Sequence, residues 1–442
     1  MAWDFETDPG FQEQLDWIDA FVREHVEPLD LLLGNPHDKG DEHAMAAVRP
    51  LYDTVKARGL WACHLGPQLG GQGYGQLKLA LMNEILGRSR WAPSVFGCQA
   101  PDSGNAEILA HFGTEEQKAE YLEPLLDGGI SSCYSMTEPH AGADPALFTT
   151  RAVRDGTDWV ITGEKWFSSN ARYASFFIVM AVTDPDAGPY RGMSMFIVPA
   201  GTPGLEIVRN VGLGGEPGRE ASHAYLRYDD VRVPADCLLG DEGGAFVISQ
   251  TRLGGGRVHH AMRTIARIRV AFDMMCERAV SRQTRKGSLA TLQMVQESVA
   301  DSWIEIEQFR LLVLRTAWLI DRHQDYQKVR KDIAAVKVAM PKVYHDVVQR
   351  AMHLHGALGV SNEMPFADML LQAEVLAIAD GPTEVHKVTV ARQVLEQYAP
   401  VDGLWPTQHL PARLEAARAQ YAELVEHLAG NEEDDLSERG PR

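Results

Sequence analysis

Residues 131–144 read SSCYSMTEPHAGAD, and residues 159–179 read WVITGEKWFSSNARYASFFIV. The first stretch is rich in turn formers, whereas the second is rich in β-branched and aromatic residues, which is typical of strands. A tight turn is the ordinary use of a Thr-Glu-Pro tripeptide. In a functional interpretation, Gly142 and Ala143 let the backbone approach a flat, phosphorylated cofactor, and Thr137 offers its hydroxyl to a ring heteroatom. The two stretches therefore predict the start of a β domain with a candidate cofactor loop at its entrance.

Short runs of β-branched and aromatic residues continue beyond this point, at 176–182, 193–198 and 223–228. The turn clusters DGTD, DPDAGPYRG and GTPG separate them. Strands spaced in this way predict an antiparallel sheet or a small barrel.

Both flanks of this region have a helical period. Before residue 130, helices are predicted at 11–26, 43–58 and 77–86, where apolar residues recur on one face. After residue 244 the apolar pattern runs in long stretches, including 303–320 and 333–355, which predicts a bundle.

The sequence thus predicts an α+β multidomain protein. The expected parts are an N-terminal α-helical domain (1–129), a middle antiparallel β-barrel-like domain (130–240), a C-terminal four-helix bundle (241–400), and a C-terminal helix with an acidic tail (401–442). In the last part an amphipathic helix is expected at 413–428.

Charge and cysteine content limit the partners. The 442-residue chain carries a formal net charge of -19, which opposes nucleic acid or an anionic membrane as a partner, because both are negatively charged. No run approaches the ~20 apolar residues that span a bilayer. The five cysteines are scattered and form no CxxC pair, which favours reduced thiols over a disulfide frame or a metal site. We expect a cytoplasmic protein that takes no metal, binds no nucleic acid and does not insert into membranes.

Five segments, in order, resemble the acyl-CoA dehydrogenase family. YSMTEPHAGAD (134–144) resembles its flavin loop, Y-x-x-TEP-x-AGSD, and ITGEKWFSSNARYA (161–174) resembles I-x-G-x-K-x-[WF]-I-[ST]-N-G-x-x-A. Residues 111–129, 228–244 and 376–395 resemble three more of its segments. The similarity covers roughly residues 10 to 400, and five ordered segments are far more specific than one TEP tripeptide.

The resemblance implies that FAD binds at the middle domain. Its contacts there would be Tyr134, Met136, Thr137, Gly142, Ala143, Trp166, Phe167 and Ser168. Thr137 would lie near N5 and O4 of the flavin, and Trp166 would cover the dimethylbenzene edge, although an aromatic in a strand is ordinarily packed inward. Ala143, also expected at the substrate entrance, replaces the family serine and so removes a hydroxyl contact.

Two bundle segments, 281–293 and 351–360, resemble family segments that approach FAD, the first from a neighbouring subunit. The cofactor residues implied in them are Arg282, Thr284, Gln293, His353, Gly356 and Ala357. Arg285 stands where the family has phenylalanine, which weakens the placement of the adenosine end. A solvated helix end is the alternative interpretation of the charges, and core packing that of the histidines.

The segment LAIADGPTEVHKVTVARQVL (376–395) resembles the family's catalytic segment. Asp380 falls on the catalytic glutamate and Gly381 on the glycine that follows it at the substrate. The flavin contacts that follow are Pro382, Thr383 and Glu384. Arg252 matches an arginine near the active site, and Thr251 cannot be a base, so Asp380 has no obvious rival. A tight turn is the alternative interpretation of Asp-Gly-Pro.

The implied reaction is FAD-dependent α,β-dehydrogenation of an acyl-CoA thioester to the trans-2-enoyl-CoA. Asp380 would remove the α-proton, and flavin N5 would take the β-hydride. The implied partners are acyl-CoA, electron-transfer flavoprotein as electron acceptor, and a second copy of the chain in a dimer or tetramer that shares the FAD site. Two alternatives stay open: a nitroalkane-oxidase-like or acyl-CoA-oxidase-like flavoprotein on the same fold, and a DNA-binding relative without dehydrogenase activity, which the acidic tail disfavours.

Overall fold

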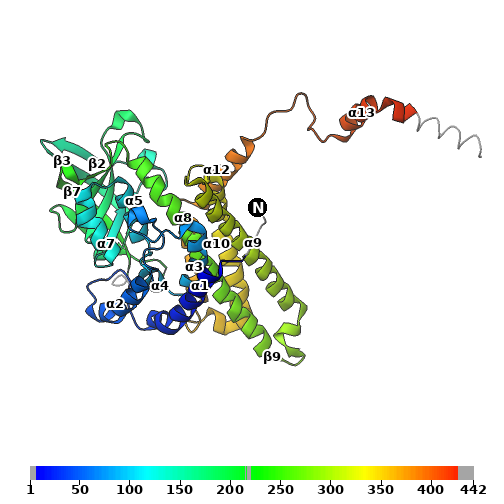
Figure 1. Cartoon of the computed structure of the whole chain (residues 1–442), viewed down its shortest axis with the longest axis horizontal. Helices are drawn as coiled ribbons and strands as arrows, with labels where there is room; N and C mark the ends of the chain where they lie inside the picture. Colours follow the sequence, from blue (N-terminus) through cyan, green and yellow to red (C-terminus); the bar gives the residue numbers. More distant parts are fainter. Residues whose placement is uncertain (1–5, 215, 217–220, 427–442) are drawn as a thin grey trace, which may run out of the picture. The chain divides into compact units, whose positions relative to one another are not determined.

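The computed structural model describes residues 6–214, 216 and 221–426. These form two compact units, Met1–Val390 and Ala391–Arg442. The first unit contains a helical N-terminal part, a sheet and a bundle of long helices (Figure 1). The predicted α+β organisation, with a β part between two helical parts, is confirmed.

The N-terminal part consists of helices that bury one apolar face each. α1 begins after Asp8, whose carboxylate accepts a hydrogen bond from Phe11 N at 2.9 Å, and it buries Phe11, Leu15, Ile18 and Phe21. The helices are α1 (Pro9–Phe21), α2 (Glu42–Ala57), α3 (Gly75–Leu86), α4 (Ala92–Val95), α5 (Asp102–Phe112), α6 (Glu115–Gln117) and α7 (Glu123–Asp127).

The middle part is an eight-stranded sheet in the order β6-β7-β3-β2-β4-β5-β8, with β1 paired to β4. Its strands are β1 (Ser132–Ser135), β2 (Arg151–Asp155), β3 (Asp158–Ser169), β4 (Phe176–Val182), β5 (Met193–Pro199), β6 (Leu205–Val211), β7 (His223–Pro234) and β8 (Leu238–Leu239). Most pairs are antiparallel, as predicted, but β1 and β2 pair parallel to β4. β1 enters directly from the helical part instead of through a hairpin, and this leaves it free to run parallel.

Side chains of β4 alternate between the two faces of the sheet. Phe176, Ile178 and Met180 join an apolar cluster with α5 and the start of α8, whereas Phe177 and Val179 pack against β3 and β7. Both faces of this strand are therefore buried, and the sheet is fixed against the helices that carry the candidate site.

The C-terminal part contains α8 (Ala245–Ser281), α9 (Gln293–His323), α10 (Arg330–His355), α11 (Phe366–Ile378) and α12 (Thr383–Leu395). The short strands β9 (Gln283–Thr284) and β10 (Gly287–Ser288) form a hairpin at the end of α8 (Figure 1). One apolar core joins α8, α9, α10 and α11 to α1, α2 and α3. The predicted bundle is confirmed.

Beyond the bundle, α13 (Leu410–Gln420) is exposed along its length. The predicted helix at 413–428 begins three residues earlier, is interrupted at Tyr421 and is helical again over 422–426, whereas 427 and 428 lie outside the described residues. The acidic end of the chain, 427–442, lies outside the described residues.

In the described part of the chain, no helix is long and apolar enough to cross a membrane, and no group of three or more His, Cys, Asp or Glu side chains could hold a metal ion. The five cysteines are free.

Candidate active site

The loop after β1 is held from behind by the carboxylate of Glu138. This carboxylate accepts hydrogen bonds from Thr149 N at 2.7 Å, Thr150 N at 3.0 Å and Lys165 Nζ at 3.0 Å. Lys165 Nζ also donates to Met136 O at 2.8 Å. Burial alone would raise the pKa of Glu138, but the charge of Lys165 and these hydrogen bonds hold it below its usual value. The loop is therefore anchored to β3 by an ionised, buried pair.

A β-bulge in β3 carries two aromatic residues beside this loop. The pairing of β3 with β7 shifts between Lys165 and Ser168, and Phe167 has a φ of 49°, which costs a non-glycine residue roughly 1–2 kcal/mol. Trp166 N donates to Thr137 O at 2.8 Å. Phe167 is 42% exposed despite its size. Bulges of this kind are common beside functional sites because they redirect side chains.

The hydroxyl of Ser168 lies inside the sheet. It is 3.2 Å from Ser135 Oγ, which accepts a hydrogen bond from Tyr228 OH at 2.9 Å. Burial raises the pKa of Tyr228 far above its usual value, so the phenol stays protonated and remains a donor. Ser168 thus ties β3 to β1 directly below the loop.

Tyr134 and Arg252 join the loop to α8. The Arg252 guanidinium lies 3.9 Å from the centre of the Tyr134 ring, and its Nε donates to Asn105 Oδ1 at 2.8 Å. Burial raises the pKa of Tyr134 to about 12, and the charge of Asp380 adds to the rise.

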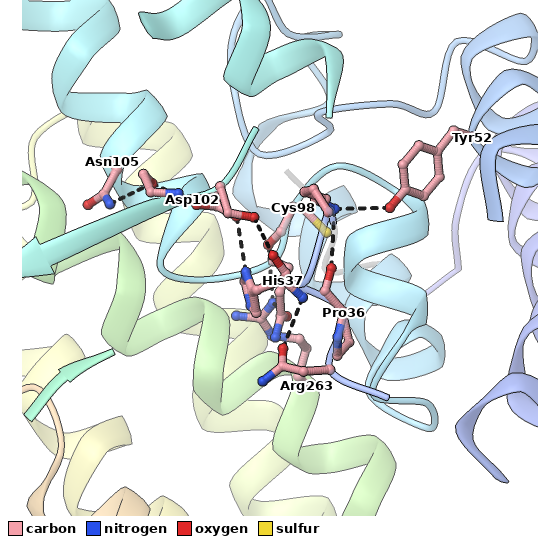
Figure 2. Close-up of polar contacts among 12 residues, drawn as sticks. Pro36, His37, Tyr52, Cys98, Asp102, Asn105 and Arg263 are labelled. Carbon is pink, nitrogen blue, oxygen red and sulfur yellow. Dashed lines mark hydrogen bonds and ion pairs between the residues drawn. The ribbon is translucent and has the colours of Figure 1, made fainter. Parts of the chain in front are cut away.

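A second network fixes β1 to α5 (Figure 2). The carboxylate of Asp102 accepts hydrogen bonds from Ser132 N at 2.8 Å and Ser132 Oγ at 2.6 Å, and it lies 3.1 Å from His37 Nδ1. Asn105 Nδ2 donates to the same Ser132 hydroxyl at 2.8 Å. Burial would raise the pKa of Asp102, but His37 and Ser132 hold it below its usual value. Because Asn105 also holds Arg252, one network sets the positions of both β1 and the arginine.

The turn between α11 and α12 places Asp380 in the left-handed conformation, with a φ of 55°. Its carbonyl oxygen accepts a hydrogen bond from Arg257 Nε at 2.9 Å and lies 3.3 Å from His386 Nε2. Thr383 Oγ1 donates to Ala377 O at 3.2 Å and closes the turn. Two buried donors on different helices therefore hold the backbone in a conformation that an isolated chain would rarely adopt.

The side chain of Asp380 faces α8 and is 20% exposed. Its Oδ2 would lie 3.4 Å from a Cβ built on Gly256, and it lies 3.9 Å from His260 Nε2. Burial lowers the pKa of Lys337 to about 8, while the charge of Asp380 opposes this change. Lys337 donates to the carbonyl of Leu376, in the helix before the turn. The carboxylate is thus surrounded by cationic and imidazole groups.

Three consecutive glycines of α8 lie opposite these groups. A Cβ on Gly254 would come within 3.1 Å of the Tyr326 ring, and one on Gly255 would lie 2.9 Å from Glu107 Oε2. Tyr326 OH donates to Glu107 Oε1 at 3.1 Å, and burial raises the pKa of Glu107 to about 7. Glycine costs a helix interior roughly 0.5–1 kcal/mol relative to alanine, so α8 gives up helical stability to admit these side chains.

The structure separates the predicted site residues into two groups. The first group lies near the loop and the turn and consists of Tyr134, Met136, Thr137, Trp166, Phe167, Ser168, Arg252, Asp380 and Gly381. Gly142 and Ala143 are exposed on the same loop. Pro382, Thr383 and Glu384 lie at the start of α12. Arg282, Thr284 and Gln293 lie at the β9–β10 hairpin, and His353, Gly356 and Ala357 lie at the end of α10. Arg282 follows Gly256 by 26 residues of helix, a separation of ~39 Å along the axis. One chain does not bring the two groups together.

The residues near the loop and the turn have the chemistry to hold a flat cofactor. Within the described part of the chain, the Thr137 hydroxyl has no hydrogen-bond partner, and it lies beside the bulge that carries Trp166 and Phe167. Gly142 has a φ of 56° and nothing within 4 Å of a Cβ built on it, so the loop backbone is open to a ligand on that side. Aromatic surfaces, an unpaired hydroxyl and open backbone together fit the isoalloxazine and phosphate parts of FAD.

Sequence reasoning missed several groups around Asp380. Arg257, His260, Lys337 and His386 are polar residues within helical patterns, where a solvated face is the ordinary interpretation. Glu107 and Tyr326 are 219 residues apart. The one local signal was the Gly254–Gly256 triplet, because a glycine run inside a long helix implies a close neighbour.

Comparison with known proteins agrees with this geometry. The chain matches three consecutive descriptions: acyl-CoA dehydrogenase, N-terminal domain, over residues 11–129; middle domain, over 133–231; and C-terminal domain, over 242–395. Acyl-CoA dehydrogenase FadE2 of Mycobacterium tuberculosis is 42% identical over 361 residues, which cover 81% of this chain and 88% of that protein.

Acyl-CoA dehydrogenase family member 11 of Gallus gallus is 39% identical over 397 residues, covering 87% of this chain and 51% of that protein, so the chain spans about half the length of this relative. The solved structure of butyryl-CoA dehydrogenase from Megasphaera elsdenii is 26% identical with a TM-score of 0.74, and the match covers 89% of this chain and 100% of that one.

The fold and the site define a flavoprotein oxidoreductase. The chain belongs to the acyl-CoA dehydrogenase family, with FAD as its cofactor.

Proposed function

We propose that this enzyme removes the α-proton and the β-hydride of an acyl-CoA thioester and gives the trans-2-enoyl-CoA, with Asp380 as the base. The proposal rests on the geometry of the turn between α11 and α12, which carries Asp380. The carboxylate of Asp380 faces α8 at Gly256, where a Cβ built on the glycine would lie 3.4 Å from Oδ2. FAD, when bound, supplies the hydride acceptor.

The turn compensates for the short side chain of the base. Aspartate is one methylene shorter than glutamate, and a base must come within hydrogen-bond reach of the proton that it removes. Gly256 adds no side chain beside the carboxylate, and the Asp380 side chain keeps 20% of its surface exposed.

The same turn offers a donor for the thioester oxygen. Among the residues that the structure describes, the backbone N–H of Asp380 has no hydrogen-bond partner, whereas its carbonyl has two. A fixed N–H that points at the oxygen stabilises the negative charge that develops there as the α-proton leaves. Base and donor would then come from one residue.

The positions of the remaining predicted FAD residues indicate which partners the enzyme needs. The residues implied at the adenosine end of FAD lie at the far end of α8, so we infer that a second copy of the chain completes the site in a dimer or tetramer. Electron-transfer flavoprotein is the proposed electron acceptor. A cytoplasmic location is proposed from the free cysteines.

The test is anaerobic bleaching of the bound flavin by a panel of acyl-CoAs. The wild type is expected to bleach with at least one thioester, and D380N to bind the same thioester but bleach on the order of 10³-fold more slowly, because the amide cannot take a proton. Asparagine tolerates the left-handed conformation, so the turn is kept. D230N is a matched control, because Asp230 has a φ of 48° in the sheet.

Unchanged bleaching in D380N would place the base elsewhere. Rapid peroxide formation in air with a nitroalkane or an acyl-CoA would favour the oxidase-like alternative.

A further inference from the structure

His260 is the titratable side chain nearest to the Asp380 carboxylate. It lies on α8 one turn after Gly256, and its Nε2 is 3.9 Å from Oδ2. This separation is just beyond a hydrogen bond, and catalytic contacts are often this long before substrate binds. In the described part of the chain, no other ionisable group forms an ion pair with this carboxylate.

The other polar groups near the turn have different partners. Arg257 and His386 bind the carbonyl oxygen of Asp380, and Lys337 binds the carbonyl of Leu376. Arginine and protonated lysine are donors only, so they cannot accept a proton from a carboxylic acid. His386 has its Nε2 at the carbonyl, where an N–H is required. Among these groups, His260 alone can present a free ring nitrogen to the carboxylate.

The surroundings keep the His260 imidazole neutral before the transfer. Burial lowers the pKa of His260 to about 4, helped by the charges of Arg263, Lys337 and Arg252 and opposed by Asp380. The groups whose charges act on His260 are Arg252 and Arg263 on α8, Lys337 on α10 and Asp380 on the turn, and the charge of His260 acts in turn on its neighbour His259 on α8. The side chain is 35% exposed, so the ring also has a route to solvent.

The proposed reaction requires a group that takes a proton from Asp380. Each turnover leaves the substrate's α-proton on Asp380, and this proton must depart before the carboxylate can act again. We propose that His260 is the proton acceptor that returns Asp380 to its ionised form after each turnover. This inference rests on the proposed function, because it takes Asp380 as the base.

The step needs no further reactant. The O–H bond of the Asp380 carboxylic acid breaks and leaves its electron pair on the carboxylate, while an N–H bond forms at Nε2 of the imidazole. The imidazolium then gives its proton to water at the exposed side of the ring and becomes neutral again. Because the pKa of His260 is lowered to about 4, the imidazolium readily gives up its proton.

The test follows proton escape separately from oxidation. A 3-thia-acyl-CoA has α-protons but no β-hydrogen, so it can be deprotonated without losing a hydride. Its α-hydrogen exchange is measured in D₂O by mass spectrometry on the FAD-loaded enzyme, and flavin reduction by the matching acyl-CoA is measured in a single turnover. The readout is the ratio of the two rates.

Three variants distinguish the roles. H260Q keeps a side-chain N–H but cannot carry a proton, and we expect its exchange-to-reduction ratio to fall by about 10-fold or more. H260A is expected to behave similarly and to regain exchange when free imidazole is added. H345Q, at a histidine on the outer face of α10 paired with Asp346, is the matched control and should keep the wild-type ratio. Flavin absorbance verifies that each variant is folded and loaded.

The outcomes separate this inference from the proposed function. A wild-type ratio in H260Q, or no response of H260A to imidazole, would overturn the role of His260 while Asp380 stays the base. A role limited to holding the carboxylate by a hydrogen bond predicts that H260Q rescues the ratio, which is the opposite result. Exchange that persists in D380N would overturn the base itself.

Discussion

Lys165 Nζ lies 3.0 Å from Glu138 Oε1, and the two side chains are 0% and 4% exposed. This ion pair joins the loop after β1 to the strand that carries Trp166. It holds the loop that carries residues expected to contact FAD, so we expect its loss to affect both stability and cofactor binding.

Removal of one partner of this pair is expected to be costly. Lys165→Met leaves the Glu138 carboxylate buried without its counter-charge, and we expect the free energy of unfolding to fall by about 3–5 kcal/mol. Denaturant unfolding and FAD retention on a desalting column measure the two effects. Arg23→Ala, which breaks an exposed pair with Asp19, is the control and should cost less than about 1 kcal/mol. Equal losses in the two variants would contradict a special role for the buried pair.

Replacing Gly256 or Gly255 of α8 by alanine should change the stability of the protein in opposite directions. A methyl group at Gly256 would make an ordinary contact with Asp380 at 3.4 Å, so Gly256→Ala should stabilise the helix by about 0.5–1 kcal/mol yet slow flavin reduction, because it fills the space before the base. Gly255→Ala should destabilise, since its Cβ would lie 2.9 Å from Glu107 Oε2 and 3.1 Å from Tyr326 OH. Thermal unfolding and stopped-flow reduction, run on both variants, give the comparison. Faster reduction in Gly256→Ala would show that the thioester does not pass this position.

The strained backbone at Phe167 predicts a trade between stability and cofactor affinity. Asparagine adopts a positive φ more readily than phenylalanine, so Phe167→Asn should stabilise the FAD-free protein by up to about 1 kcal/mol. It should also weaken FAD binding, because the exposed aromatic surface is lost. Calorimetry of the FAD-free protein and a flavin titration measure the two quantities. A variant that gains stability and binds FAD as tightly as the wild type would remove Phe167 from the site.

Buried histidines predict loss of stability in mild acid. Both ring nitrogens of His64 are buried without hydrogen-bond partners, and burial lowers its pKa to about 4 from the ordinary 6.5. Between these values the unfolded chain binds the proton and the folded chain does not, so stability falls as pH drops from about 6.5 to about 4. The slope from one such histidine is about 1.4 kcal/mol per pH unit. His64→Leu should flatten the slope of unfolding free energy against pH by about one proton, and an unchanged slope would contradict the assignment.

Regular elements were predictable from the sequence where the apolar pattern is long. The run at 176–182 coincides with β4, and the helix predicted at 333–355 ends at His355 as α10 does. These boundaries depend on local periodicity and on Gly356, which a single sequence displays. The loop at Thr137 and the turn at Asp380 are indicated by motif resemblance alone, because neither has a periodic pattern of its own.

Other features depend on contacts between distant residues. β1 has the sequence SCYS, which carries no strand signal, and it is set in place by Asp102, 30 residues earlier. The hydrogen bonds on the Asp380 carbonyl need α8 and α12 to pack around one turn, and neither helix reveals this in its own pattern. The bulge at Phe167 likewise arises from register against β7.

The length of α8 has a consequence for how catalysis depends on protein concentration. We expect the region around Gly256 and the hairpin at Arg282 to contribute to different copies of the cofactor site, because they lie ~39 Å apart along the helix axis. If the hairpin contacts the flavin of a neighbouring copy, turnover per chain should stay constant in concentrated solution. On dilution it should decline, because the copies separate and FAD dissociates. Mixed dimers would test this arrangement. One chain would carry an inactivating change at the hairpin, and the other an inactivating change at the turn. Such a dimer should then contain one working active site out of two.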